Sequence, residues 1–184
     1  MPYDALAIAN YFVCHAKSHG SPITPMKLQK LIFFAHGWHL AIKDSPLLNE
    51  QVEAWAFGPV IRSVYRAFRE YGDKPIDQEA VVLRHRENPT SGHRSLCVYT
   101  PTIDDSGPPN GFAKSLLSRV WDIYGGYTAI ELSNMTHEEN TPWAKIVAKC
   151  KAENGGELLK GTDVPTEFIK DYFRLLASRN RSPR

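Results

Sequence analysis

The segment VEAWAFGPVIRSVYRAF, residues 52–68, changes from an alternating pattern to a helical one at a Gly-Pro pair. Before the pair, small apolar residues alternate with Glu53, Trp55 and Phe57. This alternation predicts a short strand that ends at Gly58. Pro59 suits the first turn of a helix, because the N–H that it lacks has no helical partner there. We therefore expect a strand, a turn at Gly58 that a side chain would obstruct, and a helix that starts at Pro59.

Two helices are predicted before this segment. Residues 4–19 carry apolar side chains at helical spacing, and Asp4 is a good N-cap. The run SPITPMKLQKLIFFAHGWHLAIKD, residues 21–44, has a broad apolar face and Thr24 as its cap. Gly37 in its interior costs about 1 kcal/mol compared with Ala, and such a glycine often permits close approach of a neighbouring element.

The rest of the chain predicts a hairpin followed by helices. Residues 80–85 and 95–100 are β-rich and flank the loop-like ENPTSGH, so we expect a hairpin that pairs with the strand before Gly58. A loop at 102–111 then precedes four helical segments: 111–125, 128–137 with Thr128 three residues before Glu131, 141–153 and 165–179. The predicted fold is α+β and mainly α, with six to seven helices around a small antiparallel β-sheet of about three strands.

The length and charge of the chain indicate one ordinary globular domain. Of 184 residues, 42% are hydrophobic and 23% charged. Lys and Arg number 22 against 20 Asp and Glu, but the last seven residues hold three arginines and no acid. Without them the chain has 19 basic and 20 acidic residues. We expect a single near-neutral domain at 1–178 and an Arg-rich tail at 179–184.

The cysteines and the hydropathy indicate a cytoplasmic protein. Cys14, Cys97 and Cys150 are far apart and odd in number, which disfavours a disulfide framework. The N-terminal MPYDALAIANYF lacks the basic region of a signal peptide. No apolar run of about 18 residues is present, so we expect no membrane partner.

No motif predicts catalysis, a metal or a cofactor. His15 and His19 are spaced i, i+4 and His36 and His39 i, i+3, but neither pair lies in a metal signature, so seven scattered surface or half-buried histidines are favoured. There is no G-x-S-x-G elbow and no phosphate-binding loop. We therefore expect a protein that is not an enzyme.

Basic and aromatic residues offer two other hypotheses. Arg62, Arg66 and Arg69 share a helical face beside Tyr65, which could meet nucleic-acid phosphates or be a solvated face paired with nearby acids. Tryptophan and tyrosine are frequent interface anchors. Of the four tryptophans, at least two are expected in the core. Trp55 lies in a strand with apolar residues on both faces, which either this protein or a partner must cover.

The order of the motifs resembles the Panacea domain, the antitoxin domain of SocA-like and GepA-like proteins. The similar elements are KLQKL at Lys27–Leu31, EAWAFGPV at Glu53–Val60, the pair Val64–Tyr65, and the segment from Leu116 to Trp143 that contains VWDIY and ELSNMTHEENTPW. Counted from Asp4 to Trp143, the resemblance spans about three quarters of the chain.

This resemblance implies a bacterial or phage-encoded antitoxin that neutralises a cognate protein toxin by direct contact. One relative is an adaptor that presents its toxin to a protease, so a protease is a second implied partner. A nucleic-acid-binding regulator and a phage-associated accessory protein remain the alternatives. The candidate partner-binding residues are Trp55, Arg62, Tyr65, Arg66 and Arg69; the other interpretation is that the GPV segment only shapes the fold.

Overall fold

The computed structural model describes residues 1–87, 94–104, 111–154 and 161–179. The helices in this part are α1 (Ala5–Ser18), α2 (Pro25–Lys43), α3 (Arg62–Phe68), the 3-10 helix η1 (Arg69–Tyr71), α4 (Phe112–Tyr124), α5 (Ala129–His137), α6 (Pro142–Asn154) and α7 (Thr166–Arg179). The strands are β1 (Val52–Trp55), β2 (Gly58–Ile61), β3 (Val82–Glu87) and β4 (Arg94–Tyr99). The predicted class, α+β and mainly α, is confirmed.

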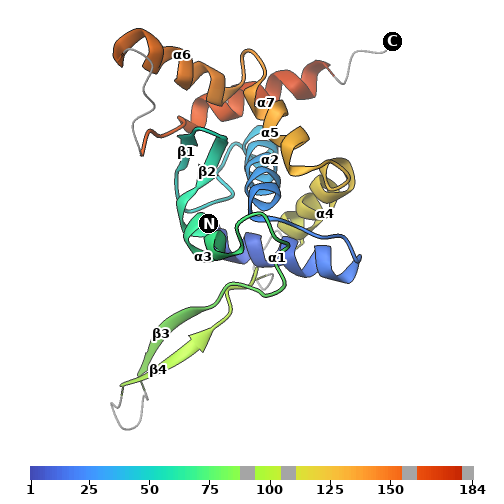
Figure 1. Ribbon diagram of the computed structural model, residues 1–184, viewed down its shortest axis with the longest axis vertical. Coiled ribbons are helices and arrows are strands. Elements are labelled where there is room, and N and C mark those ends of the chain that lie inside the picture. Colours follow the sequence, from blue (N-terminus) through green and yellow to red (C-terminus); the bar gives the residue numbers. More distant parts are fainter. Residues whose placement is uncertain (88–93, 105–110, 155–160, 180–184) are drawn as a thin grey trace.

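Helix α2 is the centre of the molecule (Figure 1). Its residues from 27 to 37 are all buried, because α1, α4, α5, α7 and β2 pack around it. Gly37 marks the contact with α7: a Cβ there would lie 2.1 Å from the ring of Phe173. The expectation that this glycine permits close approach is therefore confirmed.

The predicted helix caps are present. The side chain of Asp4 accepts a hydrogen bond from the backbone N–H of Leu6, and that of Thr24 accepts one from Lys27. Thr128 and Glu131 form a full capping box at the start of α5. Such caps satisfy N–H groups that have no partner within the helix.

The first hairpin, β1–β2, corrects the prediction that a helix starts at Pro59. Gly58–Ile61 is a strand that pairs with β1 in antiparallel register, Val52 opposite Ile61, and helix α3 begins only at Arg62. Pro59 has no N–H to donate to a neighbouring strand. Strand β2 tolerates it because one edge of a strand in a two-stranded sheet is not paired with another strand. The outer edge of β1 bonds instead to residues 162–164.

The second hairpin, β3–β4, corrects the prediction of one sheet. Its strands pair only with each other in the described part of the chain, so the structure has two sheets of two strands. In Figure 1 this hairpin extends away from the helical body. We call β3 and β4 the arm.

Some predictions fall outside the described residues. These are the loop within the arm at 88–93, most of the loop at 102–111, and the tail after Arg179. None of the helices that the structure describes is long and apolar enough to cross a membrane.

Candidate protein-binding site

Lys30 of α2 lies under the turn between β1 and β2. Only 1% of Lys30 is exposed, and its Nζ donates hydrogen bonds to the backbone oxygens of Phe57 (2.5 Å) and Pro59 (3.2 Å). Burial disfavours the charged ammonium and lowers the pKa of Lys30 to about 7. The buried lysine therefore holds the backbone of this turn in place through two hydrogen bonds.

Gln29, the preceding residue of α2, bonds to β2 in the manner of a neighbouring strand. Its Nε2 donates to the carbonyl oxygen of Ile61 (3.1 Å), and its Oε1 accepts from the N–H of Ile61 (2.8 Å). Both backbone groups of a buried residue are satisfied by one amide side chain. The KLQK motif thus attaches the hairpin to the central helix.

Helices α5 and α6 hold the same turn from another side. Ser133 Oγ donates to the carbonyl oxygen of Phe57 (3.2 Å), and Trp143 Nε1 donates to that of Trp55 (2.8 Å). The ring of His137 lies against Trp143, with centroids 3.9 Å apart. The sequence motifs of residues 27–31, 53–60 and 133–143 therefore meet at one place.

Gly58 is required at this meeting point. Its φ is +98°, which L side chains rarely adopt, and a Cβ would lie 2.5 Å from Lys30 Nζ and 2.6 Å from Thr136 Oγ1. The expectation that a side chain would obstruct the turn is confirmed.

The turn presents aromatic side chains to solvent. Phe57 is 71% exposed and Tyr65 of α3 is 41% exposed. The ring of Trp55, half-buried, lies 4.7 Å from that of Tyr65 between centroids. We call Trp55, Phe57 and Tyr65 the turn surface. Trp55 and Tyr65 were predicted as candidates, but Phe57 was missed, because the alternating pattern placed it on a strand face rather than at a turn.

Two of the three candidate arginines face carboxylates. Arg62 donates from Nε and Nη2 to the two oxygens of Glu53 (2.6 and 2.8 Å), whose Oε2 also accepts from Trp55 Nε1. The hydrogen bond from Arg62 lowers the pKa of Glu53. Arg69 Nε lies 3.2 Å from Glu70, and Arg66 is exposed. This geometry resembles the paired, solvated face rather than a row free for phosphates.

Both histidine pairs make contacts within the protein. His15 and His19 stack on each other, with centroids 4.2 Å apart. Nδ1 of buried His36 accepts from the N–H of Leu48, and burial lowers the pKa of His36 to about 4, while His39 bonds to Ser45. Among the described residues, no three His, Cys, Asp or Glu side chains are grouped as metal ligands would be.

Similarity to known proteins covers the segments that meet at this turn. The sequence model of a family described as "Antitoxin SocA-like, Panacea domain" matches residues 28–144. Antitoxin SocA of Caulobacter vibrioides (strain NA1000 / CB15N) is 34% identical over 171 residues, which is 93% of this chain and 82% of that protein. No solved structure matches the chain significantly. The matched range contains Lys30, Gly58, Ser133 and Trp143, which meet at the turn.

Proposed function

The chain belongs to the SocA-like Panacea domain family of antitoxins, and from this premise we propose that it neutralises a cognate protein toxin by binding it directly through the turn surface. Membership of an antitoxin family supports a role that needs a binding surface and no chemistry. The proposal makes Phe57 the central contact, with Trp55 and Tyr65 beside it.

The observation that carries this proposal is the contrast between the exposed ring of Phe57 and the buried support of its backbone. The carbonyl oxygen of Phe57 accepts hydrogen bonds from Lys30 and Ser133, while the residue as a whole is 71% exposed. A large apolar ring that is already held in one backbone position loses little conformational freedom on binding. Aromatic anchors of this kind dominate the energy of protein interfaces.

Coexpression with the products of neighbouring genes tests the proposal. We expect one of these products to stop growth when it is expressed alone. Coexpression of this protein should restore growth, and the two proteins should co-purify. Phe57→Ser should weaken binding to the purified toxin by about thirtyfold or more, as expected for a hot spot of about 2 kcal/mol. Ile123→Ser is the matched control, because Ile123 is 44% exposed on α4. If this protein restores growth with none of the neighbouring gene products, the proposed function is contradicted.

The same interface allows two modes of neutralisation, which the toxin's lifetime distinguishes. If binding blocks the toxin, its half-life in cells is unchanged or longer when this protein is present. If the protein acts as an adaptor for a protease, the half-life shortens, and deleting the protease restores it. The nucleic-acid alternative has less support, because Arg62 and Arg69 each lie against a carboxylate.

A further inference from the structure

One face of the arm is apolar and exposed. Leu83 lies opposite Val98, and His85 opposite Leu96, so these side chains share a face. Val81, two residues before Leu83, continues it. The exposed fractions are 58% for Val81, 65% for Leu83, 57% for Leu96 and 67% for Val98. We call these four residues the arm face; together they expose on the order of 400 Å² of apolar surface, the size of patch that marks an interaction site.

One buried side chain of the helical body binds both roots of the arm. Asn10 of α1 is 2% exposed. Its Nδ2 donates to the carbonyl oxygens of Ala80 and Pro101 (2.9 Å each), and its Oδ1 accepts from the N–H of Ala80 (2.7 Å). An isolated two-stranded hairpin is marginally stable in water, and this attachment defines where its strands begin and end.

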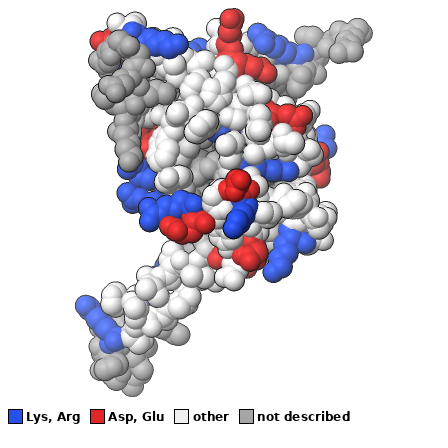
Figure 2. Space-filling view, in the orientation of Figure 1, with Lys and Arg blue, Asp and Glu red and all other residues white. Residues whose placement is uncertain are grey.

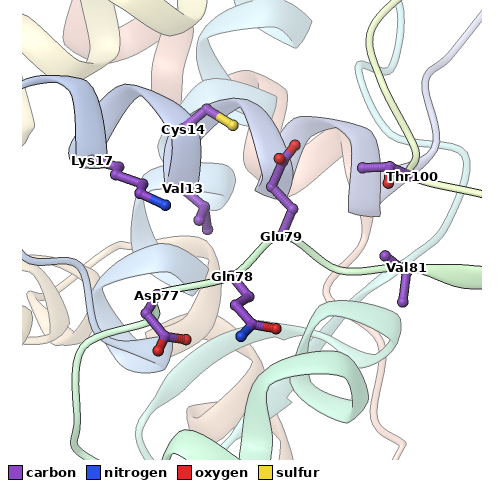
Figure 3. A pocket seen from close by; sticks show the side chains of 8 residues that line it. All are labelled: Val13, Cys14, Lys17, Asp77, Gln78, Glu79, Val81 and Thr100. Carbon is purple, nitrogen blue, oxygen red and sulfur yellow. The ribbon is translucent and has the colours of Figure 1, made fainter.

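The arm face continues into a pocket at the root of the arm. This pocket of about 320 Å³ is lined by both apolar and charged side chains (Figure 3): Val81 and Thr100 at the arm, Val13, Cys14 and Lys17 of α1, and Asp77, Gln78 and Glu79. Helix α1 forms one wall, and the segment that leads into β3 forms the other. A side chain of a bound partner can enter here while the rest of the partner lies along the arm face.

A second copy of this chain is a poor occupant for the arm face. Two arm faces packed together would bury about 800 Å² in total, below the roughly 1,200 Å² of a specific stable interface. Residues 80–99 also include three arginines and one glutamate, so two arms would repel each other. Figure 2 shows the arm with few charged atoms along its length and Lys or Arg side chains towards its far end. An acidic partner is complementary to this charge.

We propose that the arm is a second contact for the cognate toxin, and that it binds an extended segment of the toxin with alternating apolar side chains and a net negative charge. In the described part of the chain the arm has two strands, so each has an outer edge to which an extended segment can add by backbone hydrogen bonds. Alternate side chains of that segment then lie beside the arm face on the same side of the sheet, and an uncharged one enters the pocket. This inference rests on the proposed function.

The test replaces the arm face without removing the strands. The triple variant Leu83→Thr, Leu96→Thr and Val98→Thr keeps residues that favour strands but removes apolar surface. Its affinity is measured against the toxin identified by rescue, beside Ile42→Ser as control, since Ile42 is 57% exposed on α2. We expect the triple variant to weaken binding at least tenfold and the control to have no effect. Added salt should weaken wild-type binding, as charge complementarity requires.

The other outcomes separate this inference from the proposed function. Rescue and affinity that are unchanged in the triple variant overturn the arm contact and leave the proposed function standing. A wild-type dimer that the triple variant converts to a monomer, with unchanged toxin affinity, assigns the arm face to a second copy and overturns the inference. If no neighbouring gene product is toxic and bound, both the proposed function and the occupant of the arm are overturned.

Discussion

The two hairpins in the described part of the chain are both antiparallel pairs of strands, but the rest of the protein supports them in opposite ways. The β1–β2 hairpin is held at its turn, where α2, α5 and α6 bond to the backbone. The arm is held at its roots by Asn10, and its strands extend away from the body. One hairpin thus forms part of the core, and the other is attached to it.

This difference separates stability from binding. A change that moves the backbone of the β1–β2 turn disturbs the hydrogen bonds that Lys30, Ser133 and Trp143 make to it, so it should alter folding. Phe57→Ser changes an exposed side chain and leaves those backbone bonds in place. A change on the arm face removes only exposed side chains, so it should leave the folded domain intact. The following predictions test this separation.

The largest effect is expected from Gly58→Ala. The new methyl group meets Lys30 Nζ and Thr136 Oγ1, and the residue keeps a strained φ, so unfolding should become easier by about 3 kcal/mol. Gly20→Ala is the control, because Gly20 also has a positive φ but a Cβ there meets nothing within 4 Å. It should lose about 1 kcal/mol. Urea unfolding measures both, and equal losses would show that the turn is not tightly packed.

Lys30 should make stability depend on pH. Its folded pKa is about 7, against 10.5 in the unfolded chain. Between these values the unfolded state holds more protons, so stability rises with pH. The stability of the wild type relative to Lys30→Met should therefore increase by roughly 2 kcal/mol from pH 7 to 9. Lys74→Met, at an exposed lysine, is the control. A difference that stays flat over this range would mean that the ammonium is not desolvated.

Trp143→Phe should have an intermediate effect. The phenyl ring retains most of the packing but cannot donate to the carbonyl oxygen of Trp55, so we expect a loss of about 1 kcal/mol. Thermal unfolding measures the loss, and toxin binding should weaken with it because Trp55 belongs to the turn surface. If neither the stability nor the toxin affinity changes, α6 does not support the turn.

The smallest effect on stability is expected on the arm. The triple threonine variant of the arm face should change the free energy of unfolding by less than about 0.5 kcal/mol, because all three side chains are more than half exposed. Urea unfolding followed by tryptophan fluorescence measures it. A loss as large as that of Gly58→Ala would show that the arm belongs to the cooperative core.

Local sequence signals predicted much of the fold. Asp4, Thr24 and the Thr128–Glu131 pair were assigned as caps because a cap needs only a few neighbouring residues. Gly37 and Gly58 were assigned roles from their missing side chains, and the structure shows which atoms occupy that space.

Signals that depend on distant partners were not predictable. Val60 and Ile61 fit a strand as well as a helix, and the register with β1 decides in favour of the strand. The sequence of the two β-rich runs of the arm does not indicate which strand each of them pairs with. Phe57 and Lys30 were missed for the same reason. Phe57 is exposed because β1 ends at Trp55, and Lys30 is buried because it bonds to a turn that is 27 or more residues away in the chain.

The attachment of the arm by Asn10 makes it a replaceable module. The two carbonyl oxygens and the N–H that Asn10 binds belong to backbone, so they exist whatever side chains occupy the strands. We expect that a new sequence can be grafted between Ala80 and Pro101 without redesigning the helices. With the arm as the toxin contact proposed above, such a graft would change which partner is recognised, while Asn10 would still hold the ribbon to the same folded body.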